Sequence, residues 1–164
     1  MREVPWQVKQ HLAQNSIDHV LHDHVALAAC KPIEEPADVA VQLGYDLGRI
    51  AKTLILKKQR TALASAAVVA PMPDRLDFAK VAKVLGYRAE AASAAELEAA
   101  TSYPRGGVSP LGLPSNIRVV ISEALLLFPT ILVGAGCVGL EVELAPADLA
   151  RTTSGEIADI SRPG

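Results

Sequence analysis

Aromatic residues are scarce in this chain of 164 residues, which has one tryptophan, two phenylalanines and three tyrosines. Ala, Val, Leu and Ile must therefore fill the core, and half of all residues are apolar. With 21% charged residues, the composition is typical of a folded chain and excludes a disordered one. The length suits one hydrophobic core, so we expect a single domain over residues 1–164.

The chain also lacks a strong net charge, because 16 Lys and Arg face 18 Asp and Glu, for a balance of −2. Without an overall basic field, any contact with a nucleic acid must come from a local patch and must weaken with salt. Lys57, Lys58 and Arg60 form one local basic cluster. Such a cluster is either solvated surface or a site that receives phosphates.

Cysteine is rare, and Cys30 and Cys137 lack the paired spacing of a metal or redox motif. We interpret them as reduced thiols of a cytoplasmic protein. The N-terminus has no continuous apolar stretch, so no secretion signal is expected. Residues 124–140 carry no charge, but Pro129 and three glycines in this run favour two buried strands over a membrane span.

Three histidines cluster near the N-terminus, at positions 19, 22 and 24. On a strand, His22 and His24 share one face, a spacing that can bind a metal. No later histidine and no suitably placed cysteine completes a ligand set, so His19, His22 and His24 are better interpreted as a polar strand edge, and no metal site is expected. Ser109 does not lie in a nucleophile elbow, so any hydrolysis is expected to use water without a covalent enzyme intermediate.

The order of the predicted elements favours an α+β fold with a mixed, largely antiparallel sheet, because several strands follow one another after short turns. Asp77 and Ser93 are predicted helix N-caps, the latter in a capping box with Glu96, and Gly86 is a predicted helix end. Helices are predicted at residues 5–14, 34–44, 77–86, 93–100 and 146–150, and strands at 17–21, 52–58, 61–71, 118–122, 130–133 and 140–144.

Lys52 opens a strand in which period-two alternation puts it on the same face as Leu54 and Leu56. If the leucine face is buried, Lys52 points inward, and its ammonium group needs a partner or a cavity open to water. The ordinary alternative is a lysine that reaches solvent from a strand end.

Residues 103–114, YPRGGVSPLGLP, hold three glycines and three prolines. Gly106 and Gly107 allow a ligand to approach the main chain closely. Main-chain N–H groups held in such a loop suit a carbonyl oxygen that becomes negative during acyl transfer. A second glycine segment, GAGCVG at 134–139, either borders the same pocket or forms a plain hairpin turn. It is not a dinucleotide fingerprint, because a predicted strand follows it instead of a helix.

Four segments in order, GRIAKTLILK, PDRLDFAKVAKVLG, RGGVSPLG and VGAGCVGLEVELAPADL, resemble the YbaK/EbsC family and the related editing domain of bacterial prolyl-tRNA synthetases. The resemblance covers about residues 20–160. It implies a single α+β domain with a mixed sheet curled into a partial barrel and flanking helices. It also implies a trans-acting deacylase that hydrolyses the ester of a mischarged aminoacyl-tRNA, typically with Ala or Cys on the proline tRNA. No cofactor, membrane or DNA is implied; prolyl-tRNA synthetase is an implied partner.

The same resemblance implies roles for particular residues. Lys52 matches the family's functionally important lysine, expected near the aminoacyl ester and the terminal adenosine. Gly106 and Pro110 match the ends of a G-x-x-x-P loop that positions the aminoacyl group or water, which gives Gly106 a catalytic role. The expected tRNA contacts are Lys57, Lys58 and Arg60. The residues expected to bind the substrate are Gly107, Val108, Ser109, Pro110, Gly134, Ala135 and Gly136.

Among several departures from the family pattern, Cys137 and Val138 stand where many members carry arginines. Because these arginines are missing, an alternative function is that of a non-catalytic protein that retains the fold and binds tRNA or a synthetase. A small-molecule binding module that uses the same pocket is a third alternative. The spacing of Lys52, Gly106 and Pro110 favours the enzyme.

Overall fold

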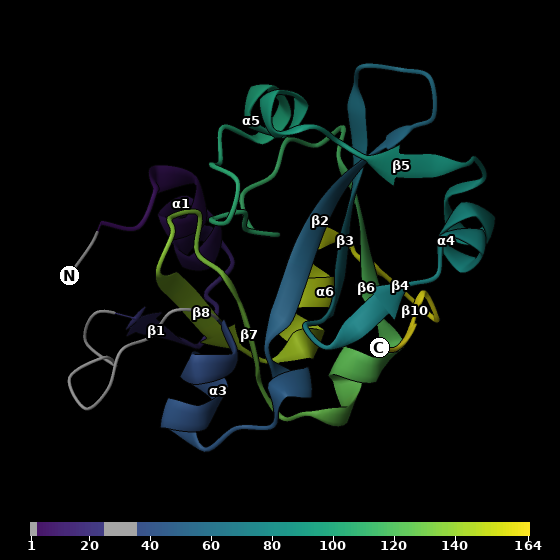
Figure 1. Ribbon diagram of the computed structural model, residues 1–164. Helices are drawn as coiled ribbons and strands as arrows, with labels where there is room; N and C mark the ends of the chain where they lie inside the picture. Colours follow the sequence, from purple (N-terminus) through teal and green to yellow (C-terminus); the bar gives the residue numbers. More distant parts are fainter. Residues whose placement is uncertain (1–2, 25–35) are drawn as a thin grey trace.

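The computed structural model describes residues 3–24 and 36–164. Figure 1 shows strands near the centre and helices around them. The strands are β1 (His19–Asp23), β2 (Ala51–Lys58), β3 (Ala64–Pro71), β4 (Asp74–Leu76), β5 (Ala89–Ala91), β6 (Arg118–Ser122), β7 (Ile131–Gly134), β8 (Leu140–Leu144), β9 (Glu156–Ala158) and β10 (Ser161–Pro163). The helices are α1 (Trp6–Gln14), α3 (Pro36–Leu43), α4 (Phe78–Leu85), α5 (Ala94–Thr101) and α6 (Pro146–Thr153), with 3-10 turns η1 (Leu47–Arg49) and η2 (Glu123–Leu127).

The central sheet has the strand order β5-β2-β3-β6-β9, in which β6 runs parallel to both β3 and β9 and the other pairs are antiparallel. A second, antiparallel sheet has the order β1-β8-β7. These pairings confirm the predicted α+β fold with a mixed, largely antiparallel sheet. In the described part of the chain the two sheets meet at a parallel bridge between Ile50 and Leu132 and do not close into a full barrel.

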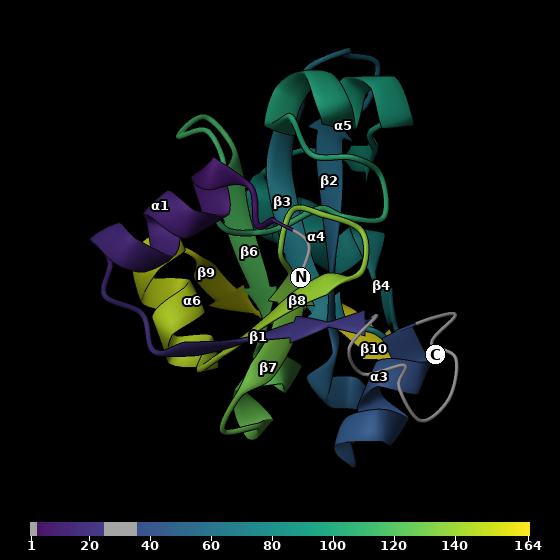
Figure 2. The ribbon, with the colours of Figure 1, turned by 90° about the vertical axis from the view of Figure 1, so that its left-hand side faces the viewer.

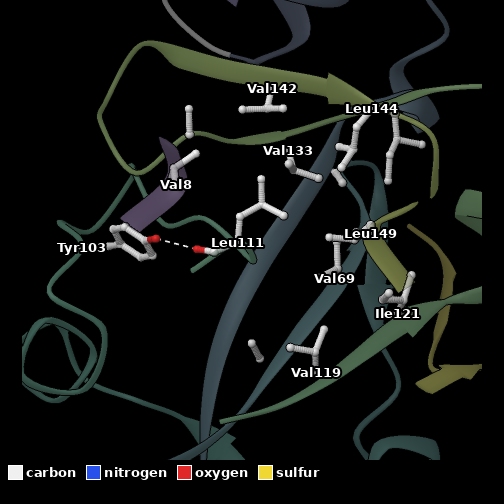
Figure 3. Close-up of a cluster of buried hydrophobic side chains, with 14 of the residues drawn as sticks. Val8, Val69, Tyr103, Leu111, Val119, Ile121, Val133, Val142, Leu144 and Leu149 are labelled. Carbon is white, nitrogen blue, oxygen red and sulfur yellow. Dashed lines mark hydrogen bonds between the residues drawn. The ribbon is translucent and has the colours of Figure 1, made fainter. Parts of the chain in front are cut away.

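The central sheet is covered on both faces. Figures 1 and 2 show α4 and the β4–β10 pair on one side, and α1 with the β1-β8-β7 sheet on the other. Alternation along β3 divides its side chains between the two sides, because Val69 belongs to the larger core cluster and Val68 to the cluster beneath α4. The larger cluster, part of which Figure 3 shows, lies between the two sheets and supports the loop described below.

The predicted helix ends are confirmed. Asp77 Oδ1 accepts hydrogen bonds from the N–H groups of Ala79 and Lys80, at 3.1 and 3.2 Å, and Gly86 ends α4 in the left-handed region at φ +86°. Ser93 and Glu96 form the capping box of α5. The three-residue strands β4, β5, β9 and β10 were not predicted, because so short a run carries no readable alternation.

The uncharged run at residues 124–140 forms most of η2, the strand β7 and the following glycine turn, and it ends at Leu140, the first residue of β8. The run therefore holds one whole strand instead of two, while the strands predicted at 130–133 and 140–144 are present as the antiparallel β7–β8 hairpin. No helix within residues 3–24 and 36–164 has the length and apolar character needed to cross a membrane. Cys137 is a free, half-buried thiol. Cys30 and the first two residues of the helix predicted at 34–44 lie outside the described residues.

Candidate functional site

Strand β2 and the loop at residues 103–114 meet across a cavity of about 260 Å³. The third wall comes from β5 and the start of α5, which pack beside the end of β2. Its lining residues are Thr53, Leu54, Ile55, Ala91, Ala92, Ser93, Ala94, Leu97, Arg105, Gly106 and Val108. The structure therefore brings the glycine loop next to β2, the strand that contains Lys52.

The loop is held in place by buried hydrogen bonds. The Tyr103 hydroxyl donates to the main-chain carbonyl of Leu111, as Figure 3 shows, and burial raises the pKa of this phenol. The Ser109 hydroxyl accepts a hydrogen bond from the N–H of Leu111 at 3.1 Å. Because Ser109 is fully buried, it shapes the loop and does not reach the cavity. The chain turns at Gly106, where φ is +86°.

The two glycine segments pack directly on each other. A Cβ on Gly107 would lie 2.9 Å from the main chain of Cys137 and Val138, and a Cβ on Gly134 would lie 2.1 Å from the Val108 carbonyl oxygen. Only glycine fits at these contacts. The segment at 134–139 thus supports the loop, and Gly134, Ala135 and Gly136 do not line the cavity.

Lys52 lies beside this site, and its amine is not among the groups that line the cavity. The half-buried side chain donates a hydrogen bond from Nζ to the main-chain carbonyl of Asp74 in β4. Burial lowers the pKa of this amine, and the Asp74 carboxylate opposes that shift. Strand β2 contacts β7, which ends at Gly134, next to the isolated bridge between Ile50 and Leu132. The main chain of Lys52 therefore lies close to the glycine segments, while its amine points to β4.

The predicted basic cluster is divided. Lys57 Nζ lies 2.8 Å from Glu96 and 3.6 Å from Glu90, and its hydrogen bond to Glu96 raises its pKa. The same bond, with those from Ser93, lowers the pKa of Glu96 to about 2. Lys58 and Arg60 remain exposed at the turn between β2 and β3. Lys57 is thus neutralised locally.

Among the cavity residues missed by sequence reasoning are two with polar side chains, Arg105 and Thr53. Arg105 is exposed and lines the cavity from the glycine loop, where a single cation among glycines and prolines was the available signal. Thr53 follows Lys52 on the opposite face of β2 and contributes a buried hydroxyl without a hydrogen-bond partner in the described part of the chain. The wall from β5 was also missed, because that strand is too short to predict.

His22 of β1 and His24, which directly follows β1, face carboxylates of β8. His22 Nε2 lies 2.7 Å from Glu143, and His24 Nε2 lies 3.6 Å from Glu141. Burial alone would raise the pKa of Glu143, but hydrogen bonds from Thr130, His22 and Tyr45 outweigh it and lower the pKa. Across residues 3–24 and 36–164, no group of three or more His, Cys, Asp or Glu could hold a metal ion.

A larger hollow of about 760 Å³ lies between η2 and the β4–β10 pair. Four carboxylates line it, and no lysine or arginine does; the four are Asp46, Asp74, Glu123 and Asp159. Such a rim repels the phosphates of a nucleic acid, so this hollow is a poor site for the end of a tRNA.

The fold is that of an editing domain. Residues 30–152 match the model of the aminoacyl-tRNA editing domain family. The chain belongs to this family and is therefore an enzyme of the aminoacyl-tRNA hydrolase class. This finding confirms the resemblance stated above.

Individual proteins agree with this assignment. The chain is 36% identical, over 124 residues that cover 75% of it and 74% of the relative, to a protein of Enterococcus faecalis named "Putative Cys-tRNA(Pro)/Cys-tRNA(Cys) deacylase EbsC". A crystal structure of the hypothetical protein APE2540 superposes with a TM-score of 0.82 at 29% identity, over 95% of this chain and 99% of that one. A structure described as "a putative trans-editing enzyme for prolyl tRNA synthetase" superposes with a TM-score of 0.81 at 20% identity, over 99% of each chain, and shows the fold alone.

Proposed function

We propose that this protein acts in trans on a mischarged tRNA and hydrolyses the ester of a small amino acid, Ala or Cys, on the proline tRNA. The observation that carries the proposal is the cavity between β2 and the glycine loop, which combines main-chain groups at Gly106 and Val108 with an apolar wall. The identity to EbsC, which is named for Cys-tRNA(Pro) and Cys-tRNA(Cys), supports cysteine as one substrate. We expect the reaction to take place in the cytoplasm, with prolyl-tRNA synthetase as a partner.

The chemistry needs few groups, because an aminoacyl ester is already activated. A water molecule adds to the ester carbon, and the carbonyl oxygen becomes negative in the tetrahedral intermediate. The bond from carbon to the ribose oxygen then breaks, the ribose oxygen receives a proton, and a free amino acid leaves. Main-chain N–H groups of the loop at Gly106 and Val108 suit the role of oxyanion donors.

Lys52 enters this proposal from the edge of the cavity. Its amine lies on the β4 side of β2, so to reach the ester or the terminal adenosine the flexible side chain must leave the Asp74 carbonyl and pass around the edge of β2, in the part that β5 does not cover. Burial lowers the pKa of its amine, which moves the group toward the range useful for proton transfer.

The dimensions of the cavity suit a small acyl group. Its volume of about 260 Å³ falls below the range of roughly 300–1,000 Å³ typical of drug-sized ligands. Arg105 at the mouth, with Lys58 and Arg60 at the adjoining turn, could contact phosphates of the acceptor end. Since the net charge is −2, these contacts are few and the affinity for tRNA is expected to be low without a partner.

The test is a deacylation assay with Cys-, Ala-, Ser- and Pro-tRNA, each made on the proline tRNA. The wild-type protein should release Cys or Ala faster than Pro. Lys52→Ala should lower the rate by about 10²-fold. Lys9→Ala, which removes an exposed lysine of α1, is the matched control and should keep the wild-type rate.

A second candidate function follows from Cys137 and Val138, which replace arginines usual in the family. A protein that binds tRNA or a synthetase without turnover would retain affinity for the tRNA but release no amino acid from any of the four substrates. That outcome would overturn the proposed hydrolysis.

A further inference from the structure

We infer that the neutral imidazole of His11 positions the glycine loop at residues 103–114 for catalysis, so that deacylation slows when this ring gains a proton. The inference rests on the proposed function, because it takes the glycine loop as part of the active site. His11 belongs to α1 and does not line the cavity between β2 and the loop. It is therefore a positioning residue, which acts through the loop.

The His11 ring joins α1 to the glycine loop and to α6. Its Nδ1 lies 3.3 Å from the main-chain nitrogen of Gly112, and its Nε2 lies 2.9 Å from Oγ1 of Thr152. The half-buried ring lines a hollow of about 300 Å³ between the end of the loop and the end of α6. Figure 2 shows α1 beside α6.

The partners of the ring define its protonation state. A main-chain N–H only donates, so Nδ1 of His11 accepts the hydrogen bond from Gly112 and carries no proton. The Thr152 hydroxyl donates to the main-chain carbonyl of Asp148 at 2.8 Å, so it accepts from the Nε2–H of His11. The neutral ring with its proton on Nε2 therefore satisfies every partner.

The hydrogen bond to His11 differs from the other bonds at this end of the loop. The N–H of Leu111 donates to the Ser109 hydroxyl, and the Leu111 carbonyl accepts from the Tyr103 hydroxyl. Both of these bonds lie within the loop. The bond from Gly112 to His11 instead ties the loop to a helix.

A displacement at Gly112 reaches the cavity wall over a short distance along the chain. Gly112 packs directly on α1, because an ideal Cβ there would lie 2.6 Å from the main-chain oxygen of Gln7. Val108, four residues earlier, lines the cavity. Pro110 lies between them and restricts the backbone, so the segment moves as a unit instead of absorbing the change.

Protonation of His11 removes the support of the loop. Both nitrogens of a charged imidazole donate, so an N–H on Nδ1 would face the N–H of Gly112 and leave it without an acceptor. Burial lowers the pKa of His11, so the ring is neutral at pH 7 and gains its proton more easily once the loop is released. The loop is therefore held at neutral pH and is released as the pH falls below about 6.5, the ordinary pKa of histidine.

No second histidine faces this hollow, and His11 is the one titratable side chain that lines it within the described residues. The adjoining elements carry other titratable side chains that do not line it, namely Lys9 on α1, Tyr103 and Arg105 on the loop, Arg118 on β6, and Asp148 and Arg151 on α6. Lysine, arginine, tyrosine and aspartate ordinarily titrate outside the range from pH 5 to pH 7, which leaves His11 as the source of a pH response here.

The experiment measures deacylation of Cys- and Ala-tRNA of the proline tRNA from pH 5 to pH 7.5, with the uncatalysed hydrolysis subtracted at each pH. His11→Asn puts an uncharged amide oxygen at the position of Nδ1, where it can accept from Gly112 at every pH. His11→Gln puts its amide at the position of Nε2, so it can reach Thr152 and leaves Gly112 without an acceptor. His19→Asn, which replaces an exposed histidine of β1, is the matched control.

We expect the wild-type rate, relative to that of His11→Asn, to fall by about tenfold between pH 7 and pH 5. At pH 7, His11→Asn should keep a rate close to that of the wild type, and His11→Gln should be slower by about tenfold. His19→Asn should keep the wild-type profile. An acid response that persists in His11→Asn, or equal rates for the Asn and Gln variants at pH 7, would overturn the inference.

A readout without turnover separates this inference from the proposed function. In NMR spectra of the wild-type protein, the Gly112 amide signal should shift with the same midpoint as the His11 ring, and this shift should be absent in His11→Asn. A Gly112 signal that ignores the ring would overturn the inference and leave the hydrolysis intact. A linked titration without turnover on any tRNA would support the contact between His11 and the loop and refute the hydrolysis.

Discussion

The carbonyl oxygen of Val108 occupies the position that a side chain on Gly134 would need, 2.1 Å from an ideal Cβ. This contact joins the two glycine segments, which lie about 26 residues apart, and it fixes the loop over the end of β2. The loop is therefore positioned by main-chain contact, which no flexible side chain can replace.

Gly134→Ala should displace the glycine loop, because main-chain atoms and not a mobile side chain fill the required space. We expect a loss of about 1–3 kcal/mol in the free energy of unfolding and a loss of most deacylation activity. Urea denaturation and the deacylation assay measure the two effects. Gly86→Ala is a matched control, since nothing lies within 4 Å of its Cβ and only the left-handed backbone is strained. It should cost stability without lowering the rate of the folded enzyme; equal activity losses in both variants would contradict this account.

Tyr103→Phe should loosen the loop at residues 103–114, because it removes the hydrogen bond between the Tyr103 hydroxyl and the Leu111 carbonyl. The variant leaves the Leu111 carbonyl buried without its phenolic partner, which costs about 1–3 kcal/mol in the free energy of unfolding. Tyr87→Phe is the matched control, because its half-buried hydroxyl bonds Ser65 and its ring packs on the cluster beneath α4, whereas Tyr103 belongs to the larger cluster. We expect only Tyr103→Phe to lower the deacylation rate, and a rate equal to wild type would show that the bond does not shape the site.

The Lys57–Glu96 pair should stabilise the fold in a defined acid range. The pKa of Glu96 is lowered to about 2 in the folded protein, mainly by Lys57 and Ser93, against about 4.3 in an unfolded chain. A depressed carboxyl pKa contributes stability above the unfolded value, and this contribution disappears as the pH falls toward 2. Thermal unfolding between pH 7 and pH 2 should show this loss in the wild type. Glu96→Gln, which keeps a side chain able to close the capping box, should lack that component, and identical pH profiles would refute it.

Arg105 should provide one of the phosphate contacts. Arg105→Ala should weaken tRNA binding and reduce the slope of log affinity against log salt by about 0.7 to 1. Lys57→Ala is the comparison, because Lys57 is already paired with Glu96 and should change the slope less. Fluorescence titrations at several salt concentrations measure both slopes. A larger effect from Lys57 than from Arg105 would reverse the assignment of the basic contacts.

Much of the fold was predictable because its signals are local. The caps at Asp77 and Ser93, the glycine stop at Gly86 and the β7–β8 hairpin each follow from a few neighbouring residues. The strands β4, β5, β9 and β10 were not predictable, since three residues become strands only through partners distant in sequence.

Part of the candidate site was likewise predictable from local sequence, and part was not. The glycine loop was predicted from its composition, whereas the wall from β5 and α5 depends on the tertiary arrangement. The partner of Lys52 is a main-chain carbonyl 22 residues away, which no side-chain pattern encodes. Alternation along the strand predicted that Lys52 and Thr53 point to opposite faces of the sheet. In the structure Thr53, and not Lys52, lines the cavity.

A crystal structure with amide-linked cysteinyl-adenosine tests the central claim most directly. The account predicts the cysteinyl group in the 260 Å³ cavity, against Thr53 and Ile55 on one side and Gly106 on the other. Density for that group in the acidic hollow between η2 and the β4–β10 pair, with the cavity empty, would contradict it.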